Sequence, residues 1–176
     1  MQSDSIDNKL DKWASQLPDL DLSGRHVIWR IDLVAHYLNR LIEDAIARYG
    51  LSASEFKVLL TLLRAAPSYQ STPTDLAVGL MTSGAMTSLI DRLETAGYVE
   101  RAPDPTDGRG VLVRLTPSGR EIIERAHTAY LARERELLSM LTDEEQRTLT
   151  ALLRKIVVSL ETAYPDKPRR HRPSKR

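Results

Sequence analysis

The stretch that decides the fold begins Pro73-Thr-Asp-Leu-Ala-Val-Gly-Leu80 and continues Ser83-Gly-Ala-Met-Thr-Ser-Leu-Ile-Asp-Arg-Leu-Glu-Thr-Ala96. Both segments are predicted helices, and the second ends at the glycine that follows it. Two β-rich runs come next, Tyr98-Val-Glu-Arg101 and Val111-Leu-Val-Arg-Leu115, separated by the turn-rich loop Pro103-Asp-Pro-Thr-Asp-Gly-Arg-Gly110. Helix, turn, helix and hairpin in this order predict a winged helix-turn-helix, a module that binds DNA.

Long amphipathic helices are predicted on both sides of this module. One runs from Ser23, an N-cap candidate, to about Tyr49, and another begins at Thr116-Pro117. Capping-box sequences at Ser52-Ala-Ser-Glu55 and Thr142-Asp-Glu-Glu145 begin two further helices, because the hydroxyl accepts from a backbone amide while the glutamate reaches back. The chain is therefore mostly helical.

The apolar stripes on the flanking helices are too wide for the core of one small domain to cover. We expect a symmetric dimer built from helices at about residues 23–49 and 117–161, with packing inside a monomeric bundle as the alternative. The predicted fold class is mainly α with a small β-wing. The winged helix occupies about residues 52–115 of a domain spanning 23–165, which follows an N-terminal arm with a short helix at residues 1–22.

The formal net charge of +1 conceals an uneven distribution. Residues 166–176 hold six Lys and Arg and one acidic residue, so this tail carries +5 and the preceding residues carry −4. The tail is too charged and proline-rich to fold alone. It either adds phosphate contacts or is a disordered, solubilising end, and the sequence leaves both open.

Composition excludes several classes of function. The chain of 176 residues has no cysteine, which rules out disulfides and a thiolate nucleophile, and it has no apolar run long enough to span a bilayer. No nucleophile with its base, metal cluster or glycine-rich phosphate cradle stands out. Asp32 and His36 lie one helical turn apart, but two such ligands do not make a metal site. We expect a cytoplasmic binding protein that is not an enzyme and holds no cofactor or metal.

The second helix of the module carries the residues expected to read DNA. An α-helix fits the major groove, and side chains near its N-terminus reach base edges while backbone amides there can hold phosphate. The candidates are Thr82, Ser83, Gly84, Thr87 and Ser88. Apolar side chains at helical spacing in the same segment are expected to face the core instead, namely Met86, Leu89 or Ile90, and Leu93.

Charged residues of the predicted wing and helix supply further candidates. Arg109 stands near the hairpin tip and is placed to enter a narrow minor groove, with Asp107 holding it through a charge-assisted hydrogen bond. Ordinary turn chemistry is the alternative for this loop. Arg92 is the first candidate for a phosphate contact. Arg92, Arg101 and Arg114 each either touch phosphate, stay solvated or pair with Glu94 and Glu100.

Six motifs of the chain together resemble the MarR family of bacterial transcriptional regulators. They are Leu76-Ala77, Thr82-Ser-Gly-Ala-Met-Thr87, Ile90-Asp-Arg-Leu-Glu94, Gly97-Tyr-Val-Glu-Arg101, Pro103-Asp-Pro-Thr-Asp-Gly-Arg109 and Leu115-Thr-Pro-Ser-Gly119. The resemblance covers the chain from about Ser23 to Leu160. It implies a homodimeric winged-helix repressor or activator that a small, often aromatic, ligand releases from its operator. In that family the helix beginning near Ser83 enters the major groove, while Asp107 and Arg109 contact the minor groove.

The N-terminal arm adds a narrower resemblance, to the urate-responsive PecS-like branch of that family. The matching residues are Asp11-Lys-Trp13 and Pro18-Asp-Leu-Asp-Leu22, and the branch has a ligand-contacting tryptophan at the position of Trp13. Lys57 and Leu89 stand where that branch has an acidic residue and an arginine, which leaves the identity of the effector open. Family ligands sit between the dimer helices and the DNA-binding module. The lining candidates are therefore Trp13, Trp29, His36 and Tyr69, with core or interface packing as the alternative for the tryptophans.

The function that these features predict is a sequence-specific regulator of transcription that binds double-stranded DNA. We expect a homodimer on a palindromic operator, with half-sites about one helical turn or 34 Å apart, and a small organic effector. Two alternatives stay open at this point. One is a winged-helix module that binds another protein, and the other is a small-molecule-binding dimer that never touches DNA.

Overall fold

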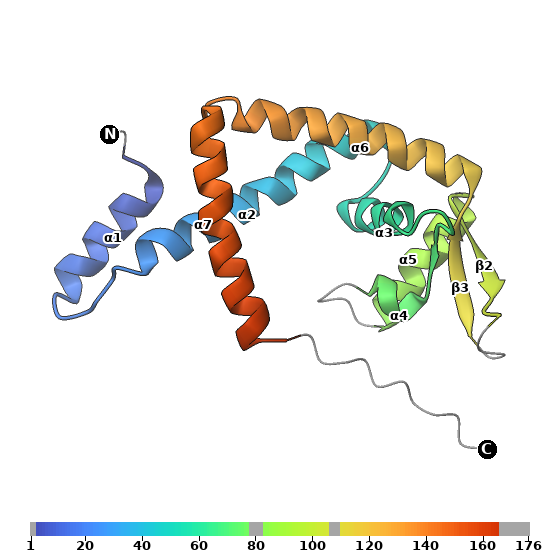
Figure 1. Cartoon of the computed structure of the whole chain (residues 1–176), viewed down its shortest axis with the longest axis horizontal. Helices are drawn as coiled ribbons and strands as arrows, with labels where there is room; N and C mark the ends of the chain where they lie inside the picture. Colours follow the sequence, from blue (N-terminus) through green and yellow to red (C-terminus); the bar gives the residue numbers. More distant parts are fainter. Residues whose placement is uncertain (1–2, 78–82, 106–109, 166–176) are drawn as a thin grey trace, which may run out of the picture. The chain divides into compact units, whose positions relative to one another are not determined.

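The computed structural model describes residues 3–77, 83–105 and 110–165 (Figure 1). These residues fall into two compact units, within Met1–Arg133 and within Glu134–Arg176. The predicted fold class is confirmed, because helices dominate and the strands form one small sheet. The helices and strands are α1 (Ser5–Gln16), α2 (Arg25–Ile46), the 3₁₀ turn η1 (Ala47–Tyr49), α3 (Ala53–Arg64), β1 (Gln70–Ser71), α4 (Pro73–Leu76), α5 (Ser83–Thr95), β2 (Val99–Pro103), β3 (Val111–Leu115), α6 (Pro117–Leu138) and α7 (Asp143–Ala163).

Local capping chemistry sets where most helices begin. Ser52 and Thr142 each accept from the amide three residues on, and the glutamate at that position accepts from the capping residue's backbone, as the sequence predicts. The prediction that Ser23 caps α2 is wrong. Gly24 holds the capping position without a side-chain bond, and the backbone N–H of Ser23 donates to Asp21 at 2.9 Å in the preceding turn.

The sheet has three antiparallel strands in the order β1-β3-β2. β1 is an addition to the predicted hairpin, for which the sequence indicated only two strands. It pairs through Gln70 with Arg114 on β3, so it forms by a contact between segments far apart in the chain. The first helix of the motif is also shorter than predicted. α4 ends at Leu76, where Ala77 leaves helical geometry, and residues 78–82 lie outside the described residues.

The hydrophobic core lies in the winged helix and the helix segments packed on it. Its largest fully buried side chains are Phe56, Ile46, Leu59, Leu62, Leu76, Met86, Leu89, Ile90, Leu93, Ile123 and Val113. Phe56 of α3 meets Tyr130 of α6 edge to face, with ring centroids 5.6 Å apart. α3 and α6 thus share this core with the module that carries the wing.

Two glycines join α5, the wing and α6. Gly97 follows α5 with φ +74°, and the amides of Gly97 and Tyr98 donate to the carbonyls of Glu94 and Leu93, the hydrogen-bond pattern of a Schellman C-cap. Gly119 lies in the first turn of α6, where an added Cβ would stand 1.9 Å from the carbonyl oxygen of Tyr98. Only glycine therefore allows α6 to begin this close to the start of β2.

Other helices leave apolar side chains exposed. On α2, only Ile42, Ala45 and Ile46 are buried. Nearer its start Trp29 and Leu33 are half-buried, and the exposed apolar residues are Val27, Ile28, Ile31 and Val34. α7 buries no residue at all, although it carries Leu149, Leu152, Leu153, Val157, Val158 and Leu160. Within the part of the chain that the structure describes, no helix combines the length and apolar character needed to cross a bilayer.

Candidate nucleic-acid interface

α5 presents one buried face and one exposed face. Met86, Leu89, Ile90 and Leu93 are at most 1% exposed and pack into the core, which confirms that they are not surface residues. The exposed residues recur at helical spacing on the other face. They are Gly84, Ala85, Thr87, Ser88, Asp91, Arg92 and Thr95. The structure therefore brings Gly84, Thr87 and Ser88 together on one accessible surface of small side chains.

Three predicted positions lie outside the described residues, namely Thr82, Asp107 and Arg109. Ser83 is the first residue of α5, so the helix begins where the sequence places it. The strands on either side of the loop are described. β2 and β3 pair from Val99 with Leu115 to Pro103 with Val111, and the amide of Asp104 donates to the carbonyl of Gly110 at 3.0 Å. The hairpin that carries the loop is thus continuous up to the loop itself.

Arg92 is held by a carboxylate of a neighbouring helix. Its Nε lies 3.2 Å from Oε1 of Glu55 on α3, while 61% of the Arg92 side chain stays exposed. Burial would raise the pKa of Glu55, but hydrogen bonds from Ser52 and the ion pair with Arg92 outweigh it and hold that pKa below its ordinary value. Glu55 therefore caps α3 and anchors α5 at the same time, a role that the capping-box pattern alone did not reveal.

Arg101 of β2 joins the wing to α5. Its guanidinium donates to Asp91 at 2.6 Å and to Glu94, and its backbone N–H donates to Glu94 at 3.3 Å. The hydrogen bond to Asp91 raises the pKa of Arg101 above its ordinary value. Of the alternatives for Arg101, the structure favours pairing with carboxylates.

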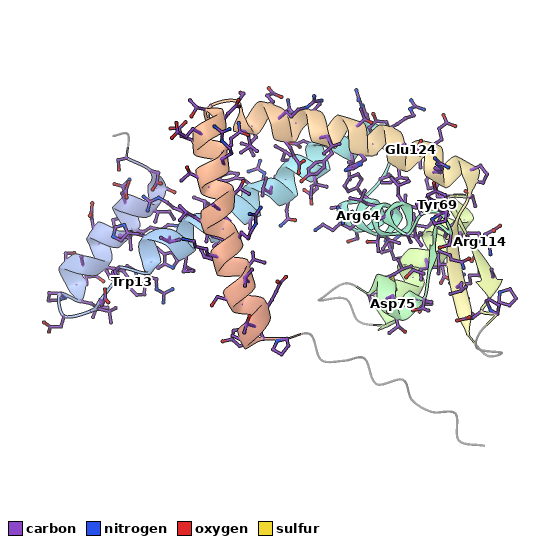
Figure 2. The ribbon with its side chains drawn as sticks, viewed as in Figure 1. Trp13, Arg64, Tyr69, Asp75, Arg114 and Glu124 are labelled. Atoms are coloured by element: carbon purple, nitrogen blue, oxygen red, sulfur yellow. The ribbon has the colours of Figure 1, made fainter. Side chains whose placement is uncertain are left out.

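Arg114 of β3, labelled in Figure 2, is also paired, but within the sheet. Its guanidinium donates to the side-chain oxygen of Gln70 at 3.2 and 3.1 Å, and it lies 3.5 Å from Glu100. Arg114 thus bonds across β1, β3 and β2. The sequence indicated Arg101 and Arg114 because acidic residues lie nearby. In the structure Arg101 pairs with α5, whereas Arg114 pairs within the sheet.

The two tryptophans meet at the seam between α1 and α2. Trp13 of α1 (Figure 2) and Trp29 of α2 are perpendicular, with ring centroids 5.6 Å apart. Trp13 keeps 40% exposure. A pocket of about 340 Å³ lies beside Trp29 and does not include Trp13. Its lining residues are Ile6, Lys9, Trp29, Asp32, Leu33 and His36. The structure therefore groups three of the four predicted ligand residues along this seam.

Tyr69, the fourth, belongs to a different part of the same unit. Its carbonyl accepts from the amide of Leu115, and the guanidinium carbon of Arg120 lies 4.9 Å from its ring centroid. Among the interactions of the described residues, none links Tyr69 to either tryptophan. Nor does any group of three or more His, Asp or Glu within these residues have a geometry suited to a metal ion.

Comparisons with known proteins agree with this geometry. A model described as MarR family matches residues 49–110. The chain is 34% identical over 152 residues to the HTH-type transcriptional regulator PecS of Dickeya dadantii (strain 3937), covering 86% of this chain and 92% of PecS. It is 38% identical over 129 residues to the multiple antibiotic resistance protein MarR of Escherichia coli (strain K12), covering 72% of this chain and 88% of MarR.

A solved structure is also similar. A mutant of E. coli MarR complexed with operator DNA matches with a TM-score of 0.64 and 36% identity, over 82% of this chain and 96% of that chain.

Proposed function

The chain belongs to the MarR family, and on that premise we propose that it is a homodimeric repressor that binds an operator in double-stranded DNA and is released by a small organic effector. We propose that the protein acts by binding DNA and catalyses no reaction. We also propose that it acts in the cytoplasm, where a bacterial chromosome lies. The observation that carries the proposal is the exposed face of α5, which holds Gly84, Thr87 and Ser88 over a helix whose other face is buried.

The chemistry of that face suits the major groove. Small hydroxyl side chains let the helix approach the bases closely, and they contact several base types. No asparagine or glutamine stands on the described face of α5, and its one arginine, Arg92, is paired with Glu55. Sequence choice therefore relies in part on the shape of the duplex, and we propose that Asp107 and Arg109 read the minor groove.

The dimer accounts for the exposed apolar surface of the other helices. A second copy of the chain would cover the side chains of α2 and α7 that find no partner within the described chain. Two copies of α5 related by a two-fold axis would then meet successive turns of one face of the duplex, about 34 Å apart.

The seam between α1 and α2 is the proposed effector site. Trp13, Trp29 and His36 supply aromatic surface beside an open pocket, which suits a flat organic molecule. An effector releases DNA only if it prefers a dimer geometry that holds the two α5 helices at the wrong spacing. Tyr69 is not part of this proposal, because it packs under Arg120.

The test is duplex binding by the full chain. Fragments from the promoter region beside its own gene are titrated at several salt concentrations, with a scrambled duplex of equal length as the control. Specific binding should weaken steeply between about 50 and 200 mM salt and should protect two half-sites. A chain that stays monomeric, or that binds operator and scrambled duplexes alike, would contradict the proposal.

A further inference from the structure

The feature that the proposed function does not use is the ion-pair cluster between the wing and α5. Arg101 lies on the same face of β2 as Val99, because side chains alternate along a strand. Val99 is 2% exposed, whereas the side chain of Arg101 keeps 33% exposure. From this face the guanidinium reaches Asp91 at 2.6 Å and also contacts Glu94.

The two acceptors are neighbours on α5. Asp91 and Glu94 lie one turn apart, and Asp91 is exposed on the face that also presents Thr87 and Ser88. A carboxylate on a surface that meets DNA repels the phosphates. The planar guanidinium can serve both carboxylates at once, which a lysine at this position could not do with fixed geometry.

A further bond ties the backbone of the strand to the same helix. The N–H of Arg101 donates to Glu94 at 3.3 Å, so both the side chain and the main chain of this residue are fixed to α5. Both links join the strand that leads into the loop of the wing to the helix expected in the major groove. Arg101 therefore adds a side-chain link and a main-chain link between the two elements proposed to read DNA, beside the short turn at Gly97 that also joins them.

We propose that Arg101 is a positioning residue for operator binding. By pairing with Asp91 and Glu94 it fixes the wing against α5 and neutralises the carboxylates that α5 brings toward the duplex, without touching DNA itself. This inference rests on the proposed function, since it requires an operator to which wing and helix must both fit.

The test compares Arg101→Gln with a matched control, Arg114→Gln, in the full-length chain. Both substitutions remove one positive charge from the sheet, but Arg114 pairs within the sheet and not with α5. Arg101→Gln should weaken operator affinity about tenfold and Arg114→Gln less than about twofold. Affinity for a scrambled duplex should fall less than operator affinity in Arg101→Gln, which loss of fold alone would not produce.

A double-mutant cycle separates positioning from direct contact. In the background Asp91→Asn with Glu94→Gln, Arg101 has lost both carboxylates, so Arg101→Gln should change operator affinity by less than about twofold. A full tenfold loss in that background would show that Arg101 binds DNA directly. Equal losses of operator affinity in Arg101→Gln and Arg114→Gln would show that Arg101 contributes only its positive charge.

The same titration distinguishes the two proposals. A wild-type chain that binds no operator overturns the proposed function, and this inference with it. A wild-type chain that binds its operator with an affinity that Arg101→Gln leaves unchanged overturns this inference alone. Helical content and dimer size are measured for each variant, and Arg101→Lys replaces any variant that fails to fold, with an expected loss smaller than that of the glutamine variant.

Discussion

The winged helix and α7 carry similar apolar repeats but bury them differently. In the winged helix, α3 and α5 bury their apolar faces in one core that includes Phe56, Leu59 and Ile90. α7 repeats leucine and valine at the same helical spacing and buries none of them. An amphipathic stripe thus shows that a helix has a partner, but it does not show whether that partner is in the same chain. The winged helix therefore has its own hydrophobic core, whereas we expect a second copy of the chain to cover the apolar face of α7.

The largest expected effect is in the core. Phe56→Ala removes a ring that is 1% exposed and meets Tyr130, and should lower the free energy of unfolding by about 3–5 kcal/mol. Chemical denaturation followed by circular dichroism measures this. Arg64→Ala, at the exposed end of the same helix, should stay within about 0.5 kcal/mol. Equal effects of the two variants would mean that α3 does not hold the core.

A different outcome is expected on α7. Leu153→Glu combined with Val157→Glu places two charges on its apolar face and should raise the dimer dissociation constant more than about 100-fold. Sedimentation gives the mass, and the denaturation midpoint of the winged helix should persist. Ala151→Glu adds a charge on the opposite face of α7, beside Arg147 and Arg154, and should leave the dimer intact. If the double variant remains dimeric, the apolar face of α7 does not form the dimer interface.

The wing should affect DNA binding without affecting the dimer. Arg109→Ala is expected to weaken operator affinity by about 1–3 kcal/mol, because we propose that the charge of Arg109 contacts the minor groove. Fluorescence anisotropy with a labelled operator measures it, and Arg120→Ala on α6 controls for the loss of one charge. If Arg109→Ala binds as tightly as the wild type, the wing takes no part in recognition.

The smallest effect concerns Glu55 and pH. The pKa of Glu55 is held below the ordinary value of 4.5, so its contribution to stability is complete above that pH and is lost as the pH falls through the lower pKa of the folded state. Glu55→Gln keeps a residue suited to the capping box but removes the ion pair. Between about pH 6 and pH 3, the melting temperature of Glu55→Gln should therefore fall less than that of the wild type. Parallel curves would show that the pair with Arg92 contributes nothing.

Local chemistry made most of the fold predictable. The capping boxes at Ser52 and Thr142 and the glycine after α5 act within one turn of the chain, so the sequence alone located those helix ends. β1 escaped prediction because two residues carry no periodicity and gain their structure from β3, more than forty positions away. The prediction that Ser23 caps α2 was wrong because serine is common in turns as well as at helix N-caps.

The candidate site was predictable in part, for the same reason. Helical spacing separated the buried Met86 from the exposed Thr87, since both lie in one regular element. Glu94 was named from the sequence as a partner for Arg101. The pairing of Arg92 with Glu55 and of Arg101 with Asp91 was not accessible to such reasoning, because each pair joins two packed elements. Spacing along the chain assigns a side chain to a face, whereas an ion pair depends on tertiary geometry.

The close approach of Gly119 to Tyr98 bears on how any signal could travel. With the glycine backbone directly against that carbonyl, and the hydroxyl of Thr116 donating to the carbonyl of Gly97 at 2.7 Å, the first turn of α6 cannot rotate without displacing β2. A tilt of this end of α6 should therefore displace the start of β2, and with it the hairpin. The joint acts as a rigid coupling, and flexibility between an effector and the duplex has to reside elsewhere in the chain.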